Sequence, residues 1–146
     1  MKLYFRTKVQ QDFKTVFAGF NRSLFEKLAP PFPRVKVIRF DGCRKGDLVE
    51  IEMHTGIATQ RWTSLITESG ENDYECYFVD EGQVLPAPLK FWRHKHIISK
   101  NDQKTFIYDQ VEYRTASVML DYMLYPVMYA QFLYRKPVYK SVFRLK

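Results

Sequence analysis

The sequence is poor in cysteine and has no zinc-binding spacing, which excludes two common kinds of small domain. Cys43 and Cys76 are the only cysteines among its 146 residues. Two isolated cysteines build neither a disulfide framework nor a C-x-x-C metal knuckle. We therefore expect both to be reduced, partly buried thiols in a cytoplasmic protein.

The chain also lacks a long uninterrupted apolar run. Its N-terminus, "MKLYFRTKVQ", alternates apolar and charged residues, unlike the continuous apolar core of a signal peptide. The longest apolar tract, residues 116–134, contains Asp121, Pro126 and Gln131 and is marginal in length for a bilayer span. Because a charge at bilayer depth is strongly disfavoured, we do not expect this tract to cross a membrane.

What the sequence does contain is enough apolar material for a core. Hydrophobic residues make up 46% of the chain, so residues 1–146 are predicted to form one domain. The 23 Lys and Arg residues outnumber the 16 Asp and Glu residues, which gives a net charge of +7. Acidic polymers, membrane surfaces and anionic small molecules all suit this charge, which does not choose among them.

The period of the apolar residues changes along the chain in a way that predicts an α+β domain. Residues 2–9 alternate apolar with charged side chains, which indicates a half-buried strand. Helical spacing follows in residues 11–34, where Gly19, Asn21 and a final "PPFP" delimit two short helices. Six further strands are predicted, joined by links rich in Gly, Pro, Asn and Asp, at 34–41, 47–55, 59–69, 72–81, 90–100 and 104–115. Consecutive strands of this kind imply an antiparallel meander.

The C-terminal region returns to helical spacing from about Ser117 to Phe143. We expect one long helix there, bent at Pro126 and bent or ended at Pro137. One stripe of this helix is predicted to pack against the sheet or to roof a pocket, because it carries Met119, Met123, Val127, Ala130 and Tyr134.

The last two strands are predicted to form a hairpin that turns at Asp102 and Gln103. Opposed residues then have numbers that sum to 205, and one face of the hairpin holds eight side chains: Trp92, His94, His96, Ile98, Ile107, Asp109, Val111 and Tyr113. The other face carries charged residues that are easily left in water, so the face with the histidines and the aspartate is predicted to point inward.

An inward cluster of two histidines and an aspartate is unusual, because a sheet face that only packs a helix has little reason to bury ionisable groups. A polar-lined cavity would explain it. The same alternation turns two further sets of side chains inward, namely Val49, Ile51 and Met53 on one strand and Trp62, Ser64 and Ile66 on the next. Mostly apolar walls with a few hydrogen-bonding groups suit an amphiphilic ligand.

Several motifs resemble the helix-grip proteins of the START-like superfamily, in particular its small bacterial SRPBCC members, which are related to polyketide cyclases. "PLKFWRHKHII" (88–98) and "TFIYDQVEYRT" (105–115) look like that group's aromatic-x-His-x-His and D-x-V-E-Y strands, and "LAPP" (28–31) follows the second helix. The resemblance covers nearly the full chain. It implies a curved antiparallel sheet of about seven strands around a long C-terminal helix. It also implies a hydrophobic cavity that binds, carries or sometimes transforms lipid-like, aromatic or polyketide molecules.

The histidine cluster has several chemical interpretations. His94, His96 and Asp109 could form part of a two-His, one-carboxylate metal site, but no motif supplies further ligands and His54 has the wrong parity. We favour instead a hydrogen-bonded pair, Asp109 with His96, which holds the hairpin and the cavity floor. The same groups could also serve as a general acid/base pair.

Two other surfaces have alternative interpretations. Arg93 and Lys95, on either side of the strand's inward His94, are more simply the solvated face of a strand than a nucleic-acid groove. The basic, aromatic tail "LYRKPVYKSVFRLK" could contact a membrane transiently, or could be an ordinary helix C-terminus with favourable cations. A chaperone-like protein would instead expose a large apolar patch.

The sequence therefore predicts binding or transport of a small hydrophobic or amphiphilic molecule, with no cofactor, no metal and no nucleic acid. The expected polar anchors, which are also the candidate catalytic groups, are His94, His96 and Asp109. The expected walls come from four parts of the chain: Trp92, Val111, Tyr113, Ile51, Met53, Trp62, Met123 and Val127. The alternative function is a cyclase, aromatase or dehydratase that uses the same cavity.

Overall fold

A computed structural model describes residues 1–146 as one curled antiparallel sheet with three helices. The elements in chain order are β1 (Lys2–Val9), α1 (Phe13–Ala18), α2 (Arg22–Leu28), β2 (Arg34–Phe40), β3 (Leu48–His54), β4 (Thr59–Glu71), β5 (Glu75–Val84), β6 (Leu89–Asn101), β7 (Lys104–Thr115) and α3 (Val118–Val142). The predicted α+β helix-grip arrangement is confirmed, with all seven strands and all three helices in the expected order.

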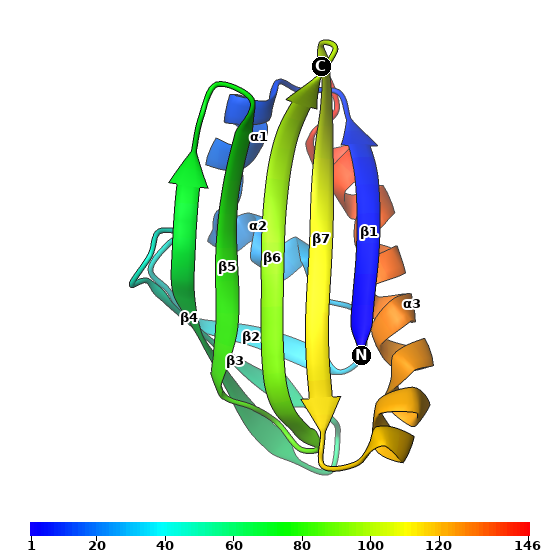
Figure 1. Ribbon diagram of the computed structural model, residues 1–146. Helices are drawn as coiled ribbons and strands as arrows, with labels where there is room; N and C mark the ends of the chain where they lie inside the picture. The colour runs from blue at the N-terminus through cyan, green and yellow to red at the C-terminus, as the bar shows by residue number, and fades with distance from the viewer.

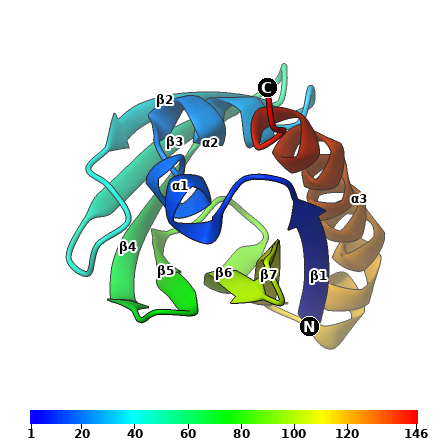
Figure 2. The same cartoon turned by 90° about the horizontal axis from the view of Figure 1, so that it is seen from above.

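The strands follow one another in the sheet except at its beginning. The order is β1-β7-β6-β5-β4-β3-β2, so β1 pairs with the last strand and leaves β1 and β2 as the two edges. Seen along its long direction, the sheet curls into a half-barrel, with α3 on the side where the two edges approach each other and α1 and α2 inside the curl (Figures 1 and 2). The concave face of the sheet is therefore its inner face.

The β6–β7 hairpin has the predicted turn and register. Asp102 and Gln103 both have positive φ, 46° and 65°, as a tight turn between twisted strands requires. His96 lies opposite Asp109 and His94 opposite Val111. All eight side chains predicted to point inward are buried. The period-two alternation of side chains therefore predicted the inward face of the hairpin correctly.

The two short helices lie inside the curl (Figure 2), and each begins at a polar N-cap. The side chain of Asp12 accepts hydrogen bonds from the backbone of Lys14 and Thr15, and that of Asn21 accepts one from Leu24. Their apolar residues pack with side chains of β4, β5, β6, β7 and the end of α3. Together they form one core cluster that includes Phe20, Phe78 and Tyr139. A second cluster fills the other end around Phe5, Trp92 and Phe132.

Helix α3 begins after the N-cap Ser117 and runs through both prolines, so the prediction that Pro137 could end it is wrong. The predicted inward stripe is also wrong. Met123 is 67% exposed and Val127 is 52% exposed, and both point away from the sheet. The buried residues of α3 are Asp121, Met128, Phe132 and Tyr139.

The physical reason for this error is that α3 is apolar nearly all round, so its hydrophobic period does not select a face. The inner face carries polar groups that are satisfied locally. Asp121 accepts a hydrogen bond from the backbone N–H of Thr115, and Tyr113 donates its hydroxyl to the carbonyl of Asp121. No helix of the structure combines the length and the apolar composition that a membrane span requires.

Candidate functional site

A cavity of about 150 Å³ lies between the inner face of β2–β6, helix α2 and the middle of α3. Fourteen of its 23 lining residues are hydrophobic. The apolar walls come mainly from β2, β3 and β4, among them Val35, Val37, Val49, Ile51, Met53, Trp62 and Ile66. Polar side chains are concentrated toward β5, β6 and α3: Asp80, His94, His96, Gln131 and Arg135.

The structure brings together most of the residues predicted to line the cavity. Ile51, Met53 and Trp62 face it from β3 and β4, and Trp92, His94 and His96 face it from β6. Four predicted wall residues lie elsewhere. Val111 and Tyr113 are buried in the second core cluster, and Met123 and Val127 are on the outer face of α3.

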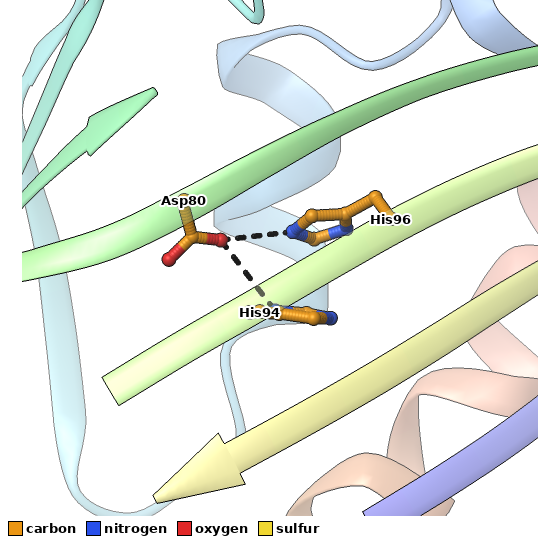
Figure 3. Close-up of side chains that lie close together, drawn as sticks. All are labelled: Asp80, His94 and His96. Atoms are coloured by element: carbon orange, nitrogen blue, oxygen red, sulfur yellow. Dashed lines mark hydrogen bonds and ion pairs between the residues drawn. The ribbon is translucent and has the colours of Figure 1, made fainter. Parts of the chain in front are cut away.

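Asp80 is the one acidic group of the cavity lining, and the sequence interpretation did not single it out. It lies on β5 opposite His94, and its Oδ2 is 3.0 Å from His96 Nε2 and 3.6 Å from His94 Nδ1 (Figure 3). Its other oxygen, Oδ1, accepts hydrogen bonds from Trp92 Nε1 at 2.9 Å and from Ser64 Oγ at 3.2 Å. Alternation with the buried Cys76 and Phe78 was the sequence signal that places Asp80 inward.

Asp109 lies behind the histidines, and its predicted hydrogen bond to His96 is wrong. His94 Nε2 donates to Asp109 Oδ1 at 2.9 Å, whereas His96 Nδ1 is 3.7 Å from the same oxygen. The reason is that side chains lean along a strand, so each imidazole bonds the carboxylate diagonal to it rather than the one opposite. The two rings thereby lie against each other, tilted by 34° with their centroids 3.6 Å apart, between Asp80 and Asp109.

Two further side chains of α3 complete the surroundings of Asp109. Tyr139 donates its hydroxyl to Asp109 Oδ1 at 3.4 Å, and Arg135 Nη1 lies 3.9 Å from the same oxygen. The guanidinium of Arg135 also covers the ring of Phe132 and borders the cavity. Its Nη1 is buried and has no hydrogen-bond partner.

Burial and pairing set the protonation of this cluster. Burial would raise the pKa of Asp109, but the hydrogen bond from His94 and the nearby cations outweigh it and lower that pKa to about 2. Burial would also raise the pKa of Asp80, but the hydrogen bond from His96, the charge interactions with both histidines and the hydrogen bond from Trp92 together lower it. Burial, together with His94, lowers the pKa of His96 to about 4, so His96 is neutral at pH 7.

A neutral His96 that donates from Nε2 to Asp80 keeps a bare Nδ1, and this atom is buried without a hydrogen-bond partner. Tyr139 stays protonated, because burial and then Asp109 raise the pKa of its hydroxyl. The cluster can therefore hold and move protons at the edge of an apolar cavity.

The cysteines supply no nucleophile. Both are free thiols, and Cys43 borders the cavity, where its Sγ donates to the carbonyl of Phe20 at 3.4 Å. Burial raises the pKa of Cys43 to about 12, so the reactive thiolate form is scarce at neutral pH.

Known proteins resemble this chain in structure and not in sequence. No known sequence family matches the chain, and no curated protein matches it. Among solved structures, protein CV1439 from Chromobacterium violaceum is 11% identical with a TM-score of 0.72, and the match covers 99% of this chain and 98% of that one.

Two further structures show the same fold. The Zhui aromatase/cyclase from Streptomyces sp. R1128 is 12% identical with a TM-score of 0.69, over 95% of this chain and 90% of that one. Ara h 8.0201 is 11% identical with a TM-score of 0.60, over 95% and 97%. Similarity at this level of identity concerns the fold alone, and it agrees with the motifs of β6 and β7. The chain has the helix-grip fold.

Proposed function

We propose that this protein binds a small hydrophobic or amphiphilic molecule in the cavity between β2–β6 and α3. One observation carries the proposal: apolar walls from β2–β4 end at a compact group of buried polar side chains on β5, β6 and α3. Such a cavity binds by removing apolar ligand surface from water, at roughly 25 cal/mol per Å². The polar end then orients the ligand.

The volume of the cavity limits the size of the ligand. A cavity of about 150 Å³ is close to the size that holds a benzene molecule and below the roughly 300–1,000 Å³ of drug-sized sites. We therefore expect a single aromatic ring or a short-chain amphiphile. A larger lipid-like or polyketide-like molecule would require α3 to move away from the strands.

The polar end favours a ligand with a hydroxyl, carbonyl or carboxylate group. Arg135 has a buried, unpartnered N–H donor beside the cavity, and His96 and Asp80 add further hydrogen-bonding atoms. An oxygen atom of the ligand that accepts from Arg135 Nη1 would satisfy this donor, which otherwise lacks a partner.

Native mass spectrometry of protein purified gently from its own host, followed by identification of any released molecule, is the direct test. We expect a stoichiometric small aromatic or amphiphilic compound. The substitution Ile51→Trp should fill the cavity and abolish its retention. Ile57→Trp is the matched control, because Ile57 is 98% exposed. Bare protein under several growth conditions, or equal retention by both variants, would contradict the proposal.

The second candidate is a cyclase, aromatase or dehydratase that uses the same cavity. The observation that favours it is the neutral His96 hydrogen-bonded to Asp80 at the cavity surface, a suitable arrangement for general acid/base catalysis. The structural similarity to an aromatase/cyclase supports the same idea. Replacement of His96 by Gln separates the two functions: a carrier should lose binding modestly, whereas an enzyme should lose product formation and keep most of its binding.

We also propose transient contact with anionic membranes during ligand loading. The outer face of α3 exposes an apolar stripe, made of Val118, Met119, Tyr122, Met123, Val127, Leu133 and Tyr134. Exposed cations follow at its C-terminal end, namely Lys140, Arg144 and Lys146. Flotation with phosphatidylserine vesicles should capture the protein at low salt, and Met123→Glu should weaken capture. Equal capture by phosphatidylcholine vesicles, or none by either, would contradict this contact.

A further inference from the structure

We propose that Asp80, His94 and His96 form a binding site for one divalent transition-metal ion, with its remaining coordination positions open to the cavity. The three side chains come from the adjacent strands β5 and β6, and Asp80 Oδ2 lies close to one nitrogen of each imidazole (Figure 3). The proposal does not depend on the organic ligand, since the three residues are in place without it. It revises the sequence-based expectation of no metal, which considered Asp109 and not Asp80 as the carboxylate ligand.

The spacing of the ligand atoms suits a metal ion. One atom from each residue lies within 4.8 Å of the other two. Asp80 Oδ2 is 3.0 Å from His96 Nε2 and 3.6 Å from His94 Nδ1. Ligands bound tetrahedrally at about 2.1 Å lie roughly 3.4 Å apart, so both separations need only small adjustments.

The hydrogen bond between His94 and Asp109 leaves the correct atom of His94 free. A carboxylate only accepts, so the proton of His94 is on Nε2, which donates to Asp109 Oδ1 at 2.9 Å. When this imidazole is neutral, the lone pair of Nδ1 faces Asp80 Oδ2, another acceptor. Two acceptors that face each other in a buried site repel, unless a proton or a cation lies between them. The proposal assigns this position to a metal ion.

The groups behind the three ligands are arranged as metal sites require. Asp109 fixes the ring of His94 in a carboxylate–histidine pair, which is the usual support of a metal-binding imidazole. Trp92 and Ser64 both donate to Asp80 Oδ1, which leaves Oδ2 available for coordination. His96 ligates through Nε2 when its proton is on Nδ1, a buried atom without a hydrogen-bond partner that lies 3.7 Å from Asp109 Oδ1.

The charge of the cluster favours a dication. The cluster contains two carboxylates, Asp80 and Asp109, but one guanidinium, Arg135, so acidic groups are in excess when both imidazoles are neutral. Two imidazole nitrogens and one carboxylate oxygen suit Zn²⁺, Co²⁺, Ni²⁺ or Fe²⁺ better than Mg²⁺ or Ca²⁺, which prefer oxygen. An ion bound here would lie where a carbonyl or hydroxyl of a cavity ligand could complete its coordination.

The test uses untagged, full-length protein stripped with a chelator and titrated with Co²⁺, followed by visible absorption and by competition with Zn²⁺. We expect binding of one ion per chain. Asp80→Asn, His94→Gln and His96→Gln should each weaken it by more than about 100-fold, since even supporting partners contribute 10- to 100-fold. Asp109→Asn, which alters a positioning residue, should weaken it by about 10- to 100-fold and change the Co²⁺ spectrum.

His54→Gln is the matched control, because His54 is an exposed histidine beside Glu52 on the outer face of β3. This variant should bind as the unaltered protein does. Ile51→Trp should also keep the metal while it loses the organic ligand, so failure of one proposal is distinguishable from failure of the other. Circular dichroism verifies that each variant is folded.

Nitrogen-15 NMR of the histidine rings in the unaltered protein provides a readout that needs no variant. Metal uptake should shift the signals of His94 Nδ1 and His96 Nε2 and leave those of His54 unchanged. Three results would overturn the proposal: no stoichiometric binding, binding that is lost only in His54→Gln, or a doubly protonated His94 that bridges the two carboxylates while no metal is taken up.

Discussion

The two halves of the sheet are both made of antiparallel strands, but their inner faces lie in different environments. On β1, β6 and β7 the inward side chains are fully buried, as at Phe5, Ile107 and Val111. On β3 every residue is only half-buried, and the inner face of this strand borders the cavity. Helix α3 accounts for the difference, because it packs against β1 and β7 and only its middle reaches the cavity.

The polar cluster of Asp80, His94, His96 and Asp109 lies at the boundary between the filled half of the sheet and the half that borders the cavity, the hollow half. Asp109, on β7, is surrounded by protein on all sides, whereas Asp80, on β5, borders the cavity. If all four side chains of this cluster lay in the filled half, no ligand could contact them. At the boundary, Asp109 can hold His94 by a hydrogen bond while Asp80 faces a ligand in the cavity.

The largest effect should come from removing the carboxylate on the filled side. Asp109→Ala leaves His94 Nε2–H and the Tyr139 hydroxyl without an acceptor and Arg135 without its counter-charge. Breaking a buried pair in this way costs about 3–5 kcal/mol of unfolding free energy. Urea denaturation measures this loss, with Asp109→Asn as the milder control. A loss below about 1 kcal/mol would show that the site is hydrated and not packed.

A pair of isoleucines compares the two halves directly. Ile107→Ala removes a side chain with no exposed surface and should cost about 2–5 kcal/mol. Ile51→Ala only enlarges an existing cavity and should cost about 1 kcal/mol, since fewer contacts are lost. Both variants are compared by the same denaturation experiment. Equal losses would mean that the hollow half is as tightly packed as the filled one.

The fold was predictable because the apolar residues recur with a clear strand or helix spacing along most of the chain. Alternation in β1 and β7, together with Gly, Pro, Asn and Asp in the links, located each strand within a few residues. The face of α3 was not predictable, because apolar residues surround this helix and its inner face includes Asp121 and Arg135. The hydrogen bonds of Asp121 and the ion pair of Arg135 with Asp109 determine which face of α3 points inward. The spacing of apolar residues does not reveal such interactions.

Acidification should weaken the cluster by a smaller amount. The pKa of His96 is about 4 in the folded protein against 6.5 as its ordinary value, so the unfolded chain binds the proton more readily. Stability is therefore highest above pH 6.5 and falls as the pH decreases toward 4. At about 1.4 kcal/mol per pKa unit, we expect a loss of roughly 1–3 kcal/mol.

Denaturation at a series of pH values, with a chelator present, measures this dependence. The variant His96→Gln is the control and should show a flatter profile between pH 6.5 and 4. Below that range Asp109, with its pKa of about 2, adds a further loss of the same sign between pH 3.8 and 2. Stability that rises on acidification would contradict the assigned protonation states.

The smallest effect should come from the outer face of α3. Met123→Gln alters a residue that is 67% exposed, so we expect a change in unfolding free energy within about 0.5 kcal/mol. Met128→Gln, one turn and a half further along on the inner face, should cost about 2–3 kcal/mol, because Met128 is buried beside the cavity. Thermal unfolding compares the two methionines. A larger loss at Met123 would mean that another surface covers it.

Only the part of the site that lies on the β6–β7 hairpin was predictable from the sequence. The register of β6 and β7 placed His94, His96 and Asp109 on one face, because a two-residue turn fixes that register. Asp80 is on a strand whose pairing with β4 contains bulges, and its contribution depends on a diagonal contact between strands. Neither the bulges nor the lean of an imidazole along its strand can be read from the order of residues.

The pairing of β1 with β7 also has a consequence for the order of folding. Residues 2–9 precede all other strands along the chain, yet their hydrogen-bonding partners are residues 105–112. The strands from β2 to β7 can pair with their neighbours in chain order, whereas β1 can pair only once β7 has formed, and α3 packs on both β1 and β7. We expect the hollow half to acquire its strands early in refolding and the filled half to close last. Pulse-labelled hydrogen exchange should accordingly protect the amides of β3 and β4 before those of β1.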